Sequence, residues 1–154
     1  MSYPEGIRGN VIGGDAAEMP LKGGVFTKMA LHCSFEHFED DTDMRFIKGA
    51  YRLLRTGGKL CILPLYLLDS YAIQTDPAVF TKKEMPLFEE DAVIYCARGW
   101  GNRHARFYDV PHLIARIVNN LDAALSLKIY NIQNAAQIDQ SCYLKFAAIF
   151  EKRA

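Results

Sequence analysis

The chain has 154 residues, half of them hydrophobic, and its 18 basic side chains balance 18 acidic ones. This length suits a single domain that can bury a core. Because the net charge is zero, no overall field would attract nucleic acid or an anionic membrane surface. We therefore expect neither of these among its partners.

The four cysteines, at positions 33, 61, 96 and 142, are widely spaced and form no Cys-x-x-Cys pair. This pattern favours the reduced thiols of a cytoplasmic protein over disulfides or a zinc site. The four histidines show no metal-ligand spacing, so no metal site is predicted. The N-terminus has no apolar signal core, and no stretch approaches the roughly 18 apolar residues of a membrane-spanning helix.

In chain order, residues 1–9 are polar and contain glycine, and we expect a lead-in without a packed role. Val11 and Ile12 form a short apolar run that stops at Gly13-Gly14-Asp15, which is typical of a strand ending in a turn. Residues 25–31 are a second predicted strand, bounded by glycines before it and polar residues after it.

Residues 42–55 are predicted to form an amphipathic helix, with acidic residues at its start and basic residues near its end. Gly57-Gly58 follows the last turn, as helix stop signals do. Residues 60–68 are almost wholly apolar, as expected of a parallel strand covered on both faces. Strand, helix and strand in this order indicate a βαβ unit of a doubly wound α/β sheet.

Residues 69–108 are predicted to form a loop-rich insert with many aromatic side chains. These side chains either cover the core or shape a substrate pocket. His104 and Arg106 are expected in a surface loop, although they could meet an acidic or hydroxylated substrate.

Asp109 and Pro111 are the start signals of another helix, on which we expect His112 to face solvent. Two strands are predicted to follow it, over residues 125–130 and 143–151. The buried face of this helix is predicted to consist of Leu113, Ile114, Ile117, Val118 and Leu121.

Four pieces of sequence occur together in a fixed order: Gly14-Asp15-Ala16-Ala17-Glu18-Met19-Pro20-Leu21, the strand that begins Val25-Phe26, Glu36-His37-Phe38, and Tyr51-Arg52-Leu53-Leu54-Arg55-Thr56-Gly57-Gly58-Lys59-Leu60. In this order and spacing they resemble the second half of a class I S-adenosylmethionine-dependent methyltransferase of the small-molecule type. The resemblance implies a Rossmann-like sheet, mainly parallel, with an antiparallel C-terminal strand pair. It covers residues 10–68 well and the rest of the chain only by the order of elements.

The family's first two strands and its glycine-rich cofactor turn have no counterpart in this sequence, so we expect a single, partial domain over residues 1–154. Neighbouring strands lie about 4.8 Å apart, so the loss would leave a gap roughly 14 Å wide. The strand ending at Asp15 must then move to the next strand, stay unpaired, or leave room for another chain. An open edge at Met29, Ala30 and Leu31 would favour a homodimer or a partner chain.

Several cofactor contacts are implied by the resemblance. Asp15 would accept a hydrogen bond from the adenine amino group, and Ala16 and Met19 would line the adenine face. His32 and Cys33 would lie at the end of the next strand, beside the sulfonium. Asp15 could instead be a turn-forming residue after two glycines.

His37 is the candidate catalytic base, because histidine is suited to accept a proton near neutral pH. The alternative is a structural histidine that caps the following helix or bonds a loop, and the same alternative applies to Glu36. Cys33 has no basic neighbour specified by the sequence, which argues against a nucleophilic thiol.

The resemblance implies methyl transfer from S-adenosylmethionine to a small molecule, by a chain that is truncated and impaired on its own. The alternative function is a non-catalytic remnant of the methyltransferase fold that acts as an association or regulatory subunit.

Overall fold

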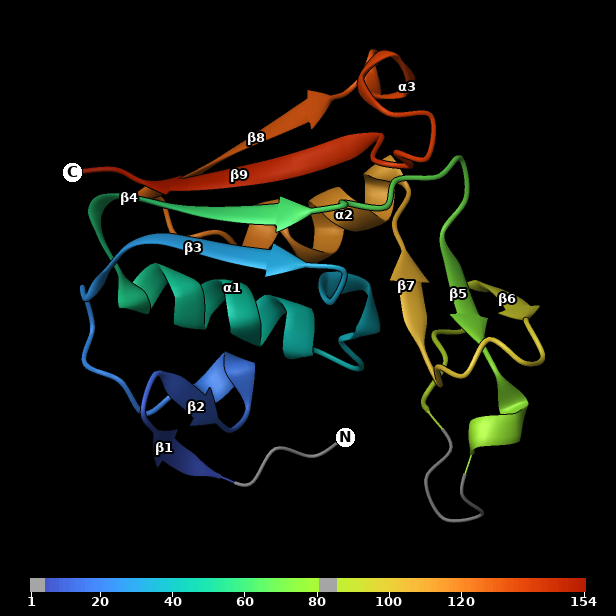
Figure 1. The fold of residues 1–154 in the computed structure, drawn as a ribbon, viewed down its shortest axis with the longest axis horizontal. Coiled ribbons are helices and arrows are strands. Elements are labelled where there is room, and N and C mark those ends of the chain that lie inside the picture. The colour runs from blue at the N-terminus through green and yellow to red at the C-terminus, as the bar shows by residue number, and fades with distance from the viewer. Residues whose placement is uncertain (1–4, 81–85) are drawn as a thin grey trace.

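The computed structural model describes residues 5–80 and 86–154, which form three small sheets and their helices (Figure 1). A hairpin pairs β1 (Gly6–Arg8) with β2 (Val11–Gly13). The central sheet contains β3 (Phe26–His32), β4 (Leu54–Leu63), β8 (Leu125–Asn131) and β9 (Phe146–Lys152). A third sheet contains β5 (Ala72–Thr75), β6 (Val93–Cys96) and β7 (Ala105–Phe107).

Three α-helices and four 3-10 turns accompany these strands. The α-helices are α1 (Thr42–Leu53), α2 (Val110–Arg116) and α3 (Ala135–Ile138). The 3-10 turns are η1 (Ala16–Glu18), η2 (Phe35–His37), η3 (Pro77–Val79) and η4 (Val118–Asn120).

The central sheet has the strand order β3-β4-β9-β8. β3 and β4 are parallel, and β9 runs antiparallel to both β4 and β8, so three of the four strands point the same way. The predicted fold class is therefore confirmed, including the antiparallel C-terminal pair. β3 lies at the edge of this sheet, as predicted from the missing strands.

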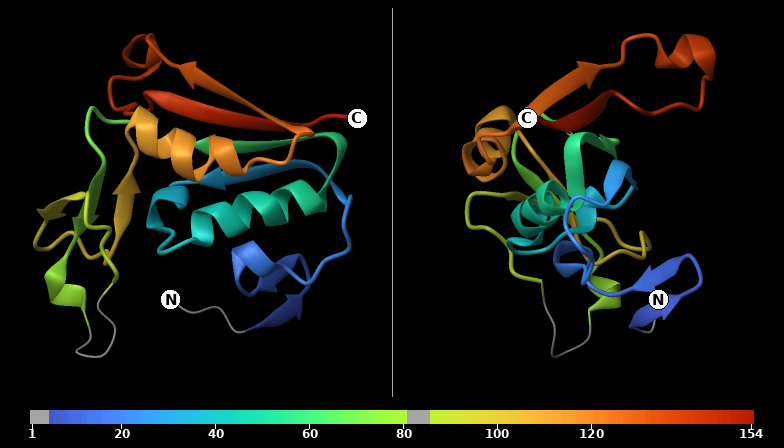
Figure 2. Two further views of the ribbon diagram at one scale, coloured as in Figure 1. Left: turned by 180° about the vertical axis from the view of Figure 1, so that it is seen from behind. Right: turned by 90° about the vertical axis from the view of Figure 1, so that its left-hand side faces the viewer.

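The two longer helices, α1 and α2, lie on one face of the central sheet (Figure 2). Phe46, Ile47 and Ala50 of α1 are buried, because apolar residues at helical spacing form one stripe that packs on the strands. The strands meet this stripe with alternate residues, and the buried ones on the central strands are Leu60, Ile62, Ala148 and Phe150. This layer is the core of the chain.

The opposite face of the central sheet carries the other alternate residues, and no described helix lies across it (Figure 2). Lys28 and Lys59 are neighbours on this face, and Ala30 lies beside Cys61. Lys28, Ala30 and Lys59 are exposed and Cys61 is half-buried. The described part of the sheet is thus covered on one face only, contrary to the two-sided covering that the apolar run at residues 60–68 predicted.

The strand predicted at Val11 and Ile12 exists, but it does not join the central sheet. β2 pairs with β1, in residues that were predicted to be an unpaired lead-in. The two strands are joined through Gly9, whose φ of 59° permits the tight turn. A partner a few residues away closes a short loop, which costs little chain entropy, so pairing is local. Ile7 and Val11 remain 65% and 57% exposed, so main-chain bonds rather than burial hold this hairpin.

η1 follows the hairpin in the chain and packs against α1. Gly49 of α1 lies against the carbonyl of Ala17, where an added Cβ would be 2.8 Å from the oxygen. Arg52 of the same helix donates a hydrogen bond to the carbonyl of Met19 at 2.6 Å. The predicted site segment around Asp15 is therefore held on the outside of α1 (Figure 1).

β4 differs from its prediction at both ends. It begins at Leu54, directly after α1, and Gly57-Gly58 lies inside it rather than between helix and strand. Phe26 pairs with Leu54 but Lys28 pairs with Lys59, so β4 carries extra residues in a bulge. Gly57 has a φ of 76°, which suits glycine in such a bulge. The strand ends at Leu63, before a cis peptide bond to Pro64.

The insert has more regular structure than predicted. β5 is parallel to β6 and antiparallel to β7, with Ala72 and Ile73 fully buried. Strands of three or four residues are too short for an alternating pattern to be read from the sequence, which explains the error.

The remaining helix and strand predictions are confirmed with small shifts in their ends. Asp109 caps α2 by accepting a hydrogen bond from the amide of His112. Leu113 and Ile117 are buried as predicted, but Ile114 and Val118 are 44% and 40% exposed. α2 ends at Arg116 and Val118 belongs to the 3-10 turn η4, so the helical spacing that predicted one continuous buried face is interrupted there.

Candidate active site

The carboxyl ends of β3 and β4 are where ligands bind in parallel α/β sheets. His32 is the last residue of β3, and Cys33 follows it with a left-handed φ of 48°. The Cys33 sulfur lies 3.4 Å from His32 Nε2 and 3.2 Å from the hydroxyl of Tyr143. The thiol therefore lies beside the imidazole of the residue before it and beside a phenol from the segment before β9.

Glu36 and His37 lie in η2, just beyond this strand end. His37 Nδ1 is 2.6 Å from the main-chain carbonyl oxygen of His104. Because a carbonyl only accepts hydrogen bonds, Nδ1 must carry the proton, and Nε2 of the neutral ring keeps its lone pair. Nε2 lies 3.8 Å from Glu36 Oε1. The ring of Trp100 is tilted against that of His37, with 5.8 Å between their centroids.

His104 was predicted to lie in a surface loop, but the structure buries it, with only 1% of the residue exposed. Neither of its ring nitrogens makes a hydrogen bond of good geometry within the described residues. Burial, reinforced by the positive charge of Arg106, lowers the pKa of His104 to about 4. His104 is therefore a neutral side chain at neutral pH, and its carbonyl is the group that orients His37.

Tyr66 follows the end of β4 and completes this group of polar side chains. Burial and the nearby charge of Glu36 raise the pKa of Tyr66 to about 12. Its ring packs edge-on against Phe107 of β7 at a centroid distance of 5.2 Å. The phenol stays protonated at neutral pH and can donate a hydrogen bond.

Arg106 was also predicted in a surface loop, but its side chain is 1% exposed. It forms an ion pair with Asp43 of α1 at 3.1 Å and another with Glu89 at 2.6 Å. Tyr108 and Arg116 also bind the carboxylate of Asp43. This network fixes the insert to α1 and leaves Arg106 no role as a substrate ligand.

His112 was predicted to face solvent, and the structure contradicts this. Its ring stacks on Tyr71 with centroids 3.9 Å apart, and its nitrogens lie 2.6 Å from Asp109 and 2.9 Å from Asp91. The histidine therefore links α2 to the insert.

Asp15, Ala16 and Met19 lie beside α1, in a different place from His32 and Cys33. Asp15 Oδ1 accepts a hydrogen bond from the amide of Ala17 at 2.9 Å, which is the turn-forming role. Its Oδ2 is 3.4 Å from Arg45, and about half of the side chain is exposed. No hydrogen bond or ion pair in the described structure joins the two groups of predicted site residues.

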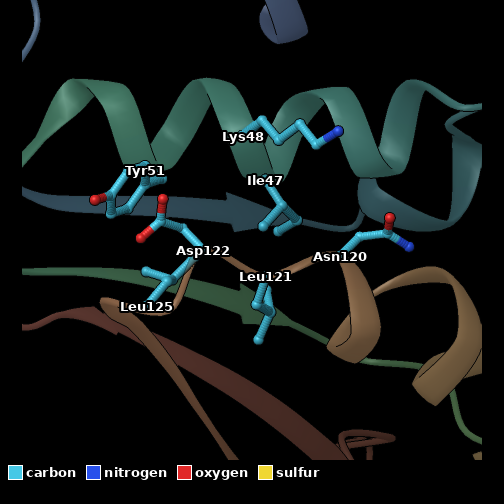
Figure 3. A pocket seen from close by; sticks show the side chains of 7 residues that line it. All are labelled: Ile47, Lys48, Tyr51, Asn120, Leu121, Asp122 and Leu125. Atoms are coloured by element: carbon cyan, nitrogen blue, oxygen red, sulfur yellow. The ribbon is translucent and has the colours of Figure 1, made fainter.

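The groove in Figure 3 lies between α1 and the segment that follows α2. It has a volume of about 250 Å³. Its lining consists of Ile47, Lys48, Tyr51, Asn120, Leu121, Asp122 and Leu125. None of the site residues predicted from the sequence contributes to it, so it is separate from the carboxyl edge of the sheet.

Across residues 5–80 and 86–154, no group of three or more metal-ligating side chains is gathered. No helix in the described part of the chain is long and apolar enough to cross a membrane.

Comparison with known families and structures gives one family. Residues 4–62 match the model of a family described as a methyltransferase domain. A crystal structure of an S-adenosylmethionine-dependent methyltransferase from Methanosarcina mazei superposes with a TM-score of 0.53 over 99% of this chain, at 10% identity. The resemblance to class I methyltransferases is confirmed.

Two further solved methyltransferases are similar in part. A possible histamine N-methyltransferase from Thermotoga maritima gives 19% identity and a TM-score of 0.48 over 92% of this chain. A 1,6-didemethyltoxoflavin-N1-methyltransferase from Burkholderia thailandensis gives 13% identity and a TM-score of 0.48 over 90%. No curated protein matches the sequence.

This chain spans 74% of the Methanosarcina structure, 62% of the Thermotoga structure and 48% of the Burkholderia structure. The fold and the family match identify S-adenosylmethionine as the cofactor of this class of methyltransferase domain.

Proposed function

We propose that this methyltransferase domain transfers a methyl group from S-adenosylmethionine to a small molecule at the carboxyl edge of β3 and β4. The observation that carries this proposal is the hydrogen bond between His37 Nδ1 and the carbonyl of His104. It leaves the other ring nitrogen with a lone pair, on a side chain that is 35% exposed. His37 is thus prepared to take a proton from the acceptor group.

The cofactor is assigned to Asp15, Ala16 and Met19 at its adenine end, and to His32 and Cys33 at the sulfur end. The residue types fit, because Asp15 offers a half-exposed carboxylate with a small and an apolar neighbour. When bound, the cofactor supplies a methyl carbon that bonds to the acceptor's lone pair as the carbon–sulfur bond breaks, which releases S-adenosylhomocysteine.

The insert at residues 69–108 is assigned to the substrate side of this site. It supplies both Trp100 and the His104 carbonyl to His37. All four cysteines are free thiols, which supports a reducing, cytoplasmic location.

Titration calorimetry with S-adenosylhomocysteine tests the cofactor site directly. We expect binding to the unaltered chain, and loss of that binding in Asp15→Ala. Glu18→Ala is the matched control, because it removes a second acidic partner of Arg45 but keeps the Asp15 carboxylate. Absence of binding at millimolar ligand, or equal affinity in Asp15→Ala, would contradict the assignment.

The open edge of β3 favours a second candidate, in which the fold serves as an association subunit. Its main-chain groups on the side away from β4 have no strand partner in the described sheet. Sedimentation velocity would then show a dimer, and Ala30→Lys, on the exposed part of β3, would shift it to monomer. A dimer that binds no S-adenosylhomocysteine would support this function over methyl transfer.

A further inference from the structure

Glu36 holds a buried carboxylate beside His37. Its side chain is 7% exposed, and Oε2 has no hydrogen-bond partner in the described structure. Oε1 lies 3.8 Å from His37 Nε2, a contact that becomes an ion pair only when this nitrogen takes up a proton. No lysine or arginine in those ranges forms an ion pair with Glu36.

Such an arrangement is costly, because a carboxylate removed from water needs a cation or several hydrogen bonds to replace its hydration. Another buried carboxylate of this chain does have such partners. Asp43, which is fully buried, binds both Arg106 and Arg116. Among the described residues, Glu36 therefore lacks the kind of partner that Asp43 has.

We propose that Glu36 binds a positively charged amine group of the methyl acceptor. This inference rests on the proposed function, and it names the class of substrate as a small molecule that carries an ammonium group. An ammonium group brings both the positive charge and the hydrogen-bond donors that Oε2 lacks.

The residues around Glu36 suit an amine in two further ways. An ammonium nitrogen has no lone pair and must lose a proton before it can accept a methyl group. His37 Nε2, 3.8 Å from Glu36, is placed to receive that proton. Trp100, whose ring centroid is 5.8 Å from that of His37, offers an aromatic face of the kind that attracts ammonium groups.

The competing occupant is the cofactor itself, whose sulfonium also carries a positive charge. The two occupants can be separated, because S-adenosylhomocysteine lacks this charge. If Glu36 balanced the sulfonium, Glu36→Gln would weaken binding of S-adenosylmethionine relative to S-adenosylhomocysteine. If Glu36 binds the acceptor amine, the ratio of these two affinities stays unchanged.

The test is titration calorimetry at pH 7 with benzylamine as the probe and benzyl alcohol as its neutral analogue, without cofactor. We expect the unaltered chain to bind benzylamine in preference to benzyl alcohol. Glu36→Gln should weaken benzylamine binding by about 30-fold or more, the usual effect of removing one partner of a buried charge pair. Glu36→Asp, which keeps the negative charge, should retain part of the affinity for benzylamine.

Glu90→Gln is the matched control, since it removes the same charge from an exposed position of the insert and should leave the affinity unchanged. Unchanged circular dichroism melting shows that each variant folds. Equal binding of benzylamine by the unaltered chain and Glu36→Gln, or no binding to either, would overturn the inference. Because no cofactor is present, failure of S-adenosylhomocysteine to bind would count against methyl transfer but not against the amine site.

Discussion

Arg106 and Asp43 form an ion pair at 3.1 Å in which neither side chain is more than 1% exposed. Arg106 belongs to β7 of the insert and Asp43 to the first turn of α1, so the pair joins segments 63 residues apart in sequence. Arg106 also donates hydrogen bonds to the carbonyls of Phe38 and Asp40. The loop that carries His37 is therefore fixed between α1 and the insert.

Removal of this carboxylate by Asp43→Ala should lower the free energy of unfolding by about 3–5 kcal/mol, because two arginines would lose their buried partner. Urea unfolding followed by circular dichroism measures this change. Asp41→Ala is the control. Asp41 pairs with Arg45 at the surface, with 59% of its side chain exposed, and its loss should cost about 1 kcal/mol or less. Equal costs for the two variants would show that the buried network is not stabilising.

The carboxylate of Asp43 also predicts how the stability of the fold changes at low pH. Burial alone would raise the pKa of Asp43, but the hydrogen bond from Arg116 and the charge of Arg106 lower it below its ordinary value of 3.8. A group whose pKa is lowered by folding stabilises the fold above its ordinary pKa, and this stabilisation is lost as the pH falls through the lowered value. The melting temperature should therefore fall below pH 4 by less in Asp43→Asn, which has no carboxylate to protonate, than in the unaltered chain.

The elements of the central sheet could be predicted because each depends on a local pattern. The apolar stripe of α1, the run at β3 and the alternation of β8 are visible in sequence windows of about 7 to 15 residues. The resemblance then supplied the antiparallel pairing of the two C-terminal strands, which no local pattern contains.

Long-range polar contacts could not be predicted in this way. His104, Arg106 and His112 were expected on the surface because charged and polar residues usually lie there. The burial of Arg106 depends on Asp43, and the position of His112 depends on Asp91; both carboxylates are distant in sequence from their partners. The hairpin of β1 and β2 was missed for a different reason, since its main-chain pairing leaves apolar side chains exposed and follows no burial pattern.

His112 predicts a second effect of pH on stability. Here stability is lost as the pH rises, whereas for Asp43 it is lost as the pH falls. Burial alone would lower its pKa, but hydrogen bonds to Asp91 and Asp109 raise it above the ordinary value of 6.5. A group whose pKa is raised by folding stabilises the fold below its ordinary pKa, and this stabilisation is lost as the pH rises through the raised value. The melting temperature should fall as the pH rises above 6.5, and this fall should be absent in His112→Gln. A parallel fall in the variant would assign the effect to another group.

Replacement of Gly49 by alanine is predicted to destabilise the fold, although such a change usually stabilises a helix. In a helix interior, glycine-to-alanine changes normally stabilise by about 1 kcal/mol. At this position the new Cβ would lie 2.8 Å from the carbonyl oxygen of Ala17, so η1 must move. We expect Gly49→Ala to destabilise by about 1–3 kcal/mol in urea unfolding. Hydrogen exchange at the Ala17 amide, which bonds Asp15, should also become faster.

Lys48→Ala is the matched control for this change, because Lys48 is the exposed preceding residue of the same helix. It should leave the free energy of unfolding and the exchange of the Ala17 amide nearly unchanged. A stabilised Gly49→Ala variant with slow exchange at Ala17 would show that η1 is not held against α1.

The role of His37 predicts a loss of rate without a loss of cofactor affinity. Glutamine can still donate a hydrogen bond to the His104 carbonyl, but it cannot take a proton from the acceptor. With benzylamine as acceptor, His37→Gln should lower the rate of S-adenosylhomocysteine formation by about 100-fold or more. Calorimetric affinity for S-adenosylhomocysteine should stay the same, which separates loss of a base from loss of the site. An unchanged rate would leave His37 with the structural role of bonding the insert through His104.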